Sequence, residues 1–190
     1  MKEASFLRIT RALTDLKQVR RQGWIQTGTT DVESVADHSF GAAFLAFTLS
    51  AGTQLDRDKV VKLALIHDLA ESVTGDIIYE SGKDVVGPIE AQHATERKVM
   101  ETILEGLDEE DKLLTLWDEW SKQETPEAVF VRRVEKIEMA NQALDYERRT
   151  GPSKKFDEFW ENAEKYLKGS ELESLYNALV SEREKLHKKK

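Results

Sequence analysis

Apolar residues recur at helical spacing along most of this chain, and polar residues occupy the positions between them. The first such segment covers about residues 4–21, and we expect it to form an amphipathic helix. The inner face of this helix would be formed by Phe6, Leu7, Ile9, Leu13, Leu16 and Val19. Gly23 predicts the end of this helix. Because only three prolines and ten glycines interrupt the 190 residues, the pattern predicts an all-α fold.

Later segments repeat the helical pattern. Thr30 and Glu33 are spaced as a helix-capping pair, and the apolar run "FGAAFLAFTLSA" after them predicts a helix that ends at Gly52. Residues 77–88 hold two glycines and a proline, so we expect a loop at the rim of a pocket, with Pro88 in the first turn of the next helix. The other expected helices cover about 57–72, 93–104, 111–120, 127–149, 156–167 and 171–187.

Length and composition favour a single helical bundle over residues 1–190. We expect a core over about residues 5–165, with the C-terminal helices over 156–187 packed on it, since no repeat or linker divides the chain. No apolar run approaches the roughly 20 residues that cross a bilayer, and no secretion signal is evident, so a cytoplasmic protein without a membrane partner is expected. The formal net charge of −8 disfavours binding to long nucleic acid.

Three titratable side chains interrupt one apolar segment, "ALIHDLAES". On a helix, His67 and Glu71 share a face, and Asp68 lies about 100° around the axis from His67. Burying an unpaired carboxylate is strongly unfavourable, so these groups need a partner, and a divalent metal ion would serve all three. The alternative is that Asp68 and Glu71 are surface charges and that His67 is a hydrogen-bonded core residue.

His38 is a second histidine embedded among small and apolar residues, in "VADHSFGAAF". His93 begins an expected helix and His187 lies in the C-terminal tail, so both are weaker candidate ligands. Because the chain contains no cysteine, a metal ion would be bound by His, Asp or Glu. Imidazole and carboxylate donors suit Mn, Fe, Co, Ni, Zn or Mg, and the donors alone do not select among these metals.

Four segments occur in the order and at the spacing of a known family. They are "LKQVRRQGW", "ESVADHSF", "LALIHDLAESVTGDI" and "FVRRVEKIEMANQALDYE". On these segments the chain resembles the HD-domain phosphohydrolases, and among them the HD-domain-containing-protein-2 group, which is similar to the bacterial 5′-deoxynucleotidase. The resemblance covers about residues 5–165. It implies a single HD-domain helical bundle, a divalent metal cofactor, a small nucleotide substrate and a homodimer.

The resemblance also implies a set of metal ligands. His38, His67 and Asp68 match three ligands of the family. The fourth family ligand is an aspartate, and Glu135 occupies the matching position in this chain. Because a glutamate side chain is one methylene longer, Glu138, one helical turn further on, is an alternative fourth ligand.

Catalytic and substrate-binding roles follow from the same resemblance. Glu71 would orient or deprotonate the attacking water, and Asp76 would manage a proton near the phosphate. Arg20, Arg21 and Trp24 match the substrate-orienting segment, and either arginine is a candidate for gripping the phosphate. Trp24 would stack on a base or sugar, or would instead be an ordinary core aromatic.

The expected reaction is hydrolysis of (deoxy)nucleoside 5′-monophosphates to nucleoside and inorganic phosphate. One alternative is another nucleotide phosphohydrolase or phosphodiesterase reaction of the superfamily, which the short chain and the lack of extra histidines disfavour. The other alternative is a non-catalytic helical binding protein whose core the metal holds together. Lys136 and the pair Arg132 and Arg133 would add positive potential near the phosphate, or would form a solvated face.

Overall fold

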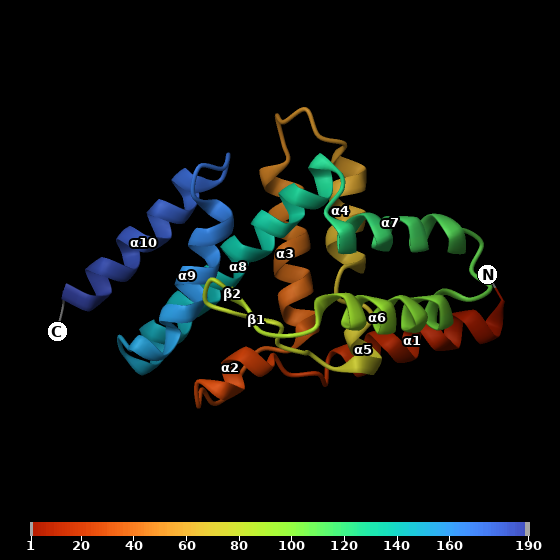
Figure 1. Ribbon diagram of the computed structural model, residues 1–190, viewed down its shortest axis with the longest axis horizontal. Helices are drawn as coiled ribbons and strands as arrows, with labels where there is room; N and C mark the ends of the chain where they lie inside the picture. The colour runs from red at the N-terminus through yellow and green to blue at the C-terminus, as the bar shows by residue number, and fades with distance from the viewer. Residues whose placement is uncertain (1, 189–190) are drawn as a thin grey trace.

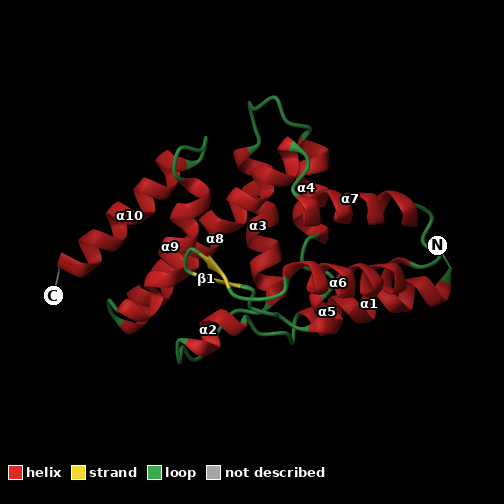
Figure 2. Cartoon of the chain, in the orientation of Figure 1, coloured by secondary structure: helices red, strands yellow, loops and turns green. Residues whose placement is uncertain are grey.

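Helices make up most of the computed structural model, which describes residues 2–188 (Figure 2). The helices are α1 (Glu3–Leu16), α2 (Gln22–Gln26), α3 (Val35–Leu49), α4 (Arg57–Ile66), α5 (Glu71–Thr74), α6 (Ile89–Leu104), α7 (Glu110–Lys122), α8 (Pro126–Thr150), α9 (Asp157–Leu167) and α10 (Glu173–Lys188). A 3₁₀ turn, η1 (Lys154–Phe156), precedes α9. The strands β1 (Glu80–Ser81) and β2 (Asp84–Val85) form a short antiparallel hairpin inside the expected 77–88 loop. The all-α prediction is confirmed.

Helix α8 is the central element of the fold. It packs against α3, α4, α9 and α10, which lie around it in Figure 1. The small buried residues Ala140 and Ala143 let these neighbours approach closely, and Phe130 and Leu144 fill the space between them. A helix that its neighbours cover on most sides holds polar side chains in a dry and rigid environment.

A second apolar cluster lies where α1, α6 and α7 meet, on the right of Figure 1. Its buried members are Ala12, Ile66, Leu69, Ala70, Met100, Ile103, Leu104, Leu114 and Trp117. Three of these residues, Ile66, Leu69 and Ala70, belong to the segment "ALIHDLAES". The cluster therefore anchors the backbone that carries His67 and Asp68.

The first helix is shorter than predicted, because α1 ends at Leu16. Residues 19–21 instead run beside the segment that precedes α3, and the Arg21 N–H donates to the Glu33 carbonyl at 3.2 Å. Gly23 lies inside the short helix α2, so its prediction as a helix end is wrong. This pairing of extended segments places Arg21 next to the start of α3.

The start of α3 also differs from the prediction. The Ser34 hydroxyl accepts a hydrogen bond from the Asp37 N–H, and the Asp37 carboxylate accepts one from the Ser34 N–H. This capping box replaces the expected pair of Thr30 and Glu33. Glu33 serves another purpose, because its carboxylate accepts a hydrogen bond from Trp24 Nε1 at 2.8 Å.

The later helices lie close to their expected positions. Helix α6 begins at Ile89, so it includes four residues before the predicted segment 93–104, and Pro88 occupies the N-cap position just before its expected place in the first turn. Helices α9 and α10 follow the predicted segments 156–167 and 171–187, and both contact α8. Within residues 2–188, no helix has the length and apolar character that a membrane span requires.

Candidate functional site

The capping box at the start of α3 fixes the position of His38. The His38 N–H donates to the Ser34 carbonyl at 3.2 Å, so His38 lies one turn inside the helix. Its side chain is 2% exposed and is directed at α8, where Nδ1 contacts a carboxylate oxygen of Glu138. The local sequence therefore presents an imidazole to the interior of the bundle.

The segment between α4 and α5 positions His67 and Asp68. Helix α4 ends at Ile66, and the following backbone hydrogen bonds join residues three apart, as from the Glu71 N–H to the Asp68 carbonyl at 3.0 Å. Side chains three residues apart are eclipsed in such 3₁₀ geometry, so Asp68 and Glu71 face the same side. The prediction of one helix over 57–72 is wrong in this last part, and the tighter turn brings the two carboxylates together.

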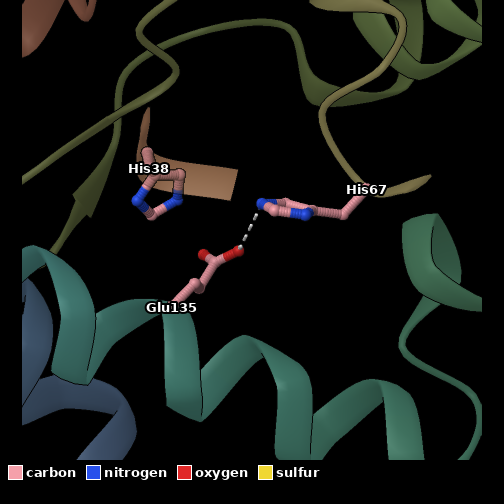
Figure 3. A group of neighbouring side chains, drawn as sticks. All are labelled: His38, His67 and Glu135. Atoms are coloured by element: carbon pink, nitrogen blue, oxygen red, sulfur yellow. Dashed lines mark ion pairs between the residues drawn. The ribbon is translucent and has the colours of Figure 1, made fainter. Parts of the chain in front are cut away.

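Side chains from three parts of the fold converge on one point. Figure 3 shows that His38 from α3, His67 from the turn after α4 and Glu135 from α8 point toward one another. One ligand atom of each residue lies within 4.8 Å of the others. His67 Nε2 is 3.9 Å from Glu135 Oε2 and 3.0 Å from Asp68 Oδ2. His38 Nε2 is 3.9 Å from the same Asp68 oxygen. The structure thus brings the four predicted ligands together.

Two of the converging atoms are buried without a hydrogen bond. His67 Nε2 and Asp68 Oδ2 have no hydrogen-bond partner among residues 2–188, although the two atoms lie only 3.0 Å apart. The His67 ring is fixed from its other side, where Nδ1 lies 2.7 Å from the Ala64 carbonyl oxygen. Buried polar atoms are normally satisfied, and a divalent cation would satisfy both of these. The residues present therefore fit such a cation.

The surroundings of Asp68 favour its ionised form. Burial alone would raise the pKa of Asp68, but the nearby His67, His38 and Arg21 outweigh burial. They lower the pKa, and Arg21 contributes from 4.0 Å, the distance between its Nη1 and Asp68 Oδ2. Metal binding requires a deprotonated carboxylate, so the charges already in place prepare Asp68 for a cation.

Glu135 is held by two cationic side chains of its own helix. Its Oε1 accepts a hydrogen bond from Arg132 Nη1 at 3.1 Å and lies 3.2 Å from Lys136 Nζ. Burial would raise the pKa of Glu135, but Arg132, Lys136 and then His67 lower it. The solvated-face alternative is wrong for Arg132 and Lys136, whose side chains are buried or nearly so. Arg133 instead pairs with Glu171 away from the site.

Glu138 lies on the other side of the His38 ring from Asp68. It contacts His38 Nδ1, whereas Asp68 faces Nε2. Glu33, Glu138 and His38 form a second group with ligand atoms within 4.8 Å of one another. Burial and then the Glu138 charge raise the pKa of Glu33. The imidazole of His38 therefore separates two clusters of carboxylates.

A cavity of about 430 Å³ opens beside the first cluster, a volume suited to a small molecule. The predicted site residues that line it are Arg21, Trp24, His38, Asp68, Glu71, Asp76 and Glu135. Arg20 is exposed and donates a hydrogen bond to the Val32 carbonyl at 3.1 Å. The structure thus brings Arg21, and not Arg20, to the cavity.

Glu71 and Asp76 lie at the cavity beside Asp68. Burial, and then the Asp68 and Asp76 charges, raise the pKa of Glu71 well above its ordinary value. Glu71 Oε2 is buried and has no hydrogen-bond partner among residues 2–188. Asp76 Oδ2 accepts a hydrogen bond from the Gln22 N–H at 2.5 Å, which ties the segment after α5 to α2. A carboxyl group with a raised pKa is suited to accept a proton from water near neutral pH.

Trp24 lines the cavity although it is only 1% exposed. Its ring stacks on Phe159, with 3.8 Å between ring centroids, and makes an edge contact with Tyr146. Most of the ring surface is therefore covered by the protein itself. The stacking of Trp24 on a base or sugar stays a prediction.

Sequence reasoning missed the cavity wall that the hairpin and α9 form. Tyr79, Phe159 and Asn162 line this wall. Glu80 joins the hairpin to α9, because it accepts hydrogen bonds from Tyr166 Oη at 2.6 Å and from Asn162 Nδ2 at 3.1 Å. These partners lie more than 80 residues apart, so no local pattern indicated them. The one usable signal was an aromatic residue, Tyr79, in a loop close to a predicted catalytic carboxylate.

A second cavity, of about 30 Å³, lies behind His67, Asp68 and Glu71. His93 and Glu96 of α6 contribute to its lining. The volume is about that of one water molecule in the liquid. His93 is thus close to the site without joining the converging ligands.

Known proteins resemble this chain over nearly its whole length. The sequence profile of the family described as "HD domain" matches residues 13–175. The 5′-deoxynucleotidase HDDC2 of Mus musculus is 32% identical over 182 residues, which cover 95% of this chain and 89% of that protein. The 5′-deoxynucleotidase hdd1 of Schizosaccharomyces pombe is 30% identical over 190 residues, with 96% and 92% covered. Among solved structures, a conserved hypothetical protein from Pyrococcus furiosus matches with a TM-score of 0.72 and 29% identity, over 95% of this chain and 99% of that one.

Proposed function

The chain belongs to the HD-domain family, and we propose that it is a metal-dependent 5′-deoxynucleotidase, which hydrolyses deoxynucleoside 5′-monophosphates to nucleoside and inorganic phosphate. The observation that carries this proposal is the convergence of buried, unsatisfied ligand atoms at the wall of a nucleotide-sized cavity. A metal-dependent phosphomonoesterase needs a metal ion, a general base and a positively charged side chain that binds phosphate, all around one point. Glu71 and Arg21 lie at the same cavity as the metal cluster.

In this proposal, His38, His67, Asp68 and Glu135 hold the divalent cation. A bound cation would polarise a phosphate oxygen and lower the pKa of a bound water. Arg21 would donate hydrogen bonds to the phosphate, since its guanidinium lies at the cavity beside Asp68. Mn, Co, Mg, Zn, Ni and Fe all suit these donors, and a metal panel would identify the one that supports turnover.

Glu71 is the proposed general base. It would take a proton from the attacking water as the water oxygen bonds to phosphorus and the bond from phosphorus to the 5′-oxygen breaks. The leaving oxygen then needs a proton, and Asp76, which faces the same cavity, would relay to it the proton that Glu71 took from the water. The raised pKa of Glu71 supports this role, because a strongly acidic carboxyl would be a poor base near neutral pH.

We also propose a homodimer in the cytoplasm. Support for the dimer comes from α3, whose outer side carries Phe40, Phe44 and Phe47, which are 73%, 57% and 51% exposed. Residues at this spacing form one stripe of a helix, and an exposed apolar stripe is typical of a protein interface. Sedimentation of wild type and Phe44→Glu would test it, with a monomer expected for the variant. The cytoplasmic location stays a prediction.

The activity is tested by phosphate release from ribo- and deoxynucleoside 5′-monophosphates, each with one metal of the panel, for wild type and Asp68→Ala. We expect metal-dependent release by wild type alone, with deoxynucleotides preferred. Folding of both proteins is checked by circular dichroism. If folded, metal-loaded wild type released no phosphate from any monophosphate, the nucleotidase proposal would be wrong, and di- and triphosphates would be tested next.

A further inference from the structure

We propose that Glu138 is a positioning residue for the metal ligand His38, and that Gly41 provides the space in which it acts. The inference rests on the metal site of the proposed function and deepens it. It assigns Glu138 to the second layer around the cation and not to the ligand set. Three observations support the inference. The two ring nitrogens of His38 have different partners, His38 and Glu138 are both buried, and a glycine lies in the middle of α3.

The two ring nitrogens of His38 face different partners. Nδ1 contacts Glu138 Oε2, and Nε2 is directed at Asp68 Oδ2, 3.9 Å away. An imidazole that donates its proton from Nδ1 keeps the lone pair on Nε2, which is the atom on the side of the other ligands. Glu138 thereby selects the tautomer of His38 that binds a cation from this side.

His67 reaches the same state through a weaker partner. Its Nδ1 lies 2.7 Å from the Ala64 carbonyl oxygen, so a neutral acceptor holds this ring. A carboxylate accepts a stronger hydrogen bond than a carbonyl does and makes the imidazole a better donor to a metal. His38 is therefore the ligand whose strength depends on a second side chain.

Burial makes this contact strong. His38 is 2% exposed and the Glu138 residue is 7% exposed, so little water competes for the hydrogen bond. The pair also joins α3 to α8, since 100 residues separate its members. A fixed carboxylate on α8 consequently holds the His38 ring in one orientation relative to Glu135, one turn away on the same helix.

Gly41 supplies the room for the Glu138 side chain. A Cβ atom at position 41 would lie 3.2 Å from both Cγ and Oε1 of Glu138, closer than most real contacts. Glycine weakens a helix interior relative to alanine, so its presence there calls for a packing reason. The carboxylate that supports His38 is such a reason.

Glu33 offers the competing explanation, in which Glu33, His38 and Glu138 are themselves ligands of a cation. The Glu33 carboxylate already accepts the indole N–H of Trp24 at 2.8 Å, and Glu138 already accepts from His38. Neither carboxylate is among the buried atoms that lack a partner, whereas Asp68 Oδ2 is. The geometry therefore favours Glu138 as a support over Glu138 as a ligand.

The test is Co²⁺ binding without nucleotide, followed by competition with a chelator and by the visible absorption of bound Co²⁺. The proteins are wild type, Glu138→Ala, Glu138→Gln and the control Glu147→Gln, another buried carboxylate of α8 that lies far along the helix and pairs with Arg183. We expect Glu138→Ala to weaken Co²⁺ binding by about 10- to 100-fold. The absorption bands should keep their positions, because the ligand set is unchanged.

Glu138→Gln should lie between wild type and Glu138→Ala, since its amide oxygen still accepts from Nδ1. Such partial rescue by the conservative variant distinguishes positioning from general damage. Glu147→Gln should lower the melting temperature of the metal-free protein and leave Co²⁺ affinity unchanged. If Glu138→Ala does not fold, the Glu138→Gln result decides, and wild-type affinity in that variant would overturn the proposal.

Gly41→Ala tests the second half of the inference. It should weaken Co²⁺ binding in the wild-type background, because the new methyl group displaces Glu138. It should have no further effect in Glu138→Ala if the displaced carboxylate is the cause, since coupled residues show such non-additivity. Equal loss in both backgrounds would overturn the role assigned to Gly41.

Two results would overturn the role of Glu138. One is Co²⁺ affinity of folded Glu138→Ala within about threefold of wild type, well below the loss expected for a second-layer partner. The other is a spectrum that shows a lost ligand. Because no nucleotide is present, failure of this proposal is separate from failure of the nucleotidase proposal, which phosphate release decides.

Discussion

Helix α8 carries buried carboxylates in two regions that differ in how their surroundings satisfy polar atoms. Toward its C-terminal end, Glu147 is fully buried, and Arg183 donates to its two oxygens at distances of 2.9 and 3.1 Å. Toward its middle, Glu135 faces a cluster in which His67 Nε2 and Asp68 Oδ2 have no hydrogen-bond partner within the described chain.

The difference separates a structural ion pair from a binding site. Arg183 also pairs with Asp157 at 2.6 Å and lies over the Trp160 ring, so the partners of Glu147 all come from the chain itself. Removing one partner of such a buried ion pair is strongly destabilising, so the pair links α10 to α8. Buried polar atoms that the chain leaves unsatisfied need a ligand from outside.

The largest expected effect is on catalysis. Glu71→Gln should lower kcat by about 10²- to 10⁴-fold, because it removes the proposed base without changing the shape of the side chain. Its stability and Co²⁺ affinity should change little, since Glu71 is not a proposed ligand. Phosphate-release kinetics, chelator competition and thermal melting measure the three quantities. Retained kcat in Glu71→Gln would place Glu71 with the structural charges.

The next largest expected effect is on stability, with activity unchanged. Glu147→Ala should lower the free energy of unfolding by about 3 kcal/mol, because it leaves Arg183 partly buried without its main partner. Activity per folded molecule should stay at the wild-type level. Urea denaturation and kinetics below the transition measure both. A parallel loss of kcat would mean that the two regions of α8 are not independent.

Stabilisation by added metal should also distinguish the cluster around Asp68 from the ion pair of Glu147. At a Mn²⁺ concentration about 100 times its Kd, the free energy of unfolding of wild type should rise by about 2.7 kcal/mol. The same gain is expected in Glu147→Gln, which has lower starting stability. Asp68→Ala should gain much less at the same concentration. An equal gain in all three proteins would place the stabilising cation elsewhere.

The smallest effect concerns pH and the rim of the cavity. The pKa of Glu80 is lowered from 4.5 to about 2. Burial alone would raise this pKa, but the charge of Lys136 and the hydrogen bonds from Tyr166, Asn162 and Lys165 outweigh burial. Because the pKa of Glu80 is lower in the folded state, the ionised side chain contributes its full stabilisation of the fold above about pH 4.5. This contribution is lost as the pH falls toward about 2.

Glu80→Gln should therefore be less stable than wild type at pH 7, and the difference should shrink between about pH 4.5 and 2. Urea denaturation over this pH range measures it. Wild-type and variant curves that run parallel through the range would show that Glu80 is not the titrating group.

The helical fold was predictable because apolar periodicity is a local property of the sequence. His38, His67 and Asp68 were identifiable for a related reason, since each is a polar residue inside an apolar segment whose burial the pattern indicates. The family resemblance then supplied Glu135, which no local pattern distinguishes from a solvated helix charge. The structure adds the observation that Arg132 and Lys136 hold it.

Features that depend on distant partners were not predictable. The turn at His67 looked like continuing helix, because its residues favour helix and only the packing under α1 and α6 shows where α4 ends. The hairpin at residues 80–85 is too short to give a strand pattern, and Glu80 fixes it to a helix about 80 residues away. The contact between His38 and Glu138 spans 100 residues and was not predicted as a support for the ligand.

Gly41 has a consequence for protein engineering. Routine thermostabilisation replaces helix glycines by alanine, because alanine restricts the unfolded chain and favours the helix. At most positions such a change is harmless, but here the added methyl group would reach the carboxylate behind a proposed metal ligand. Selection for heat resistance alone would not detect a loss of metal affinity, whereas selection for turnover at low metal concentration should reject this substitution.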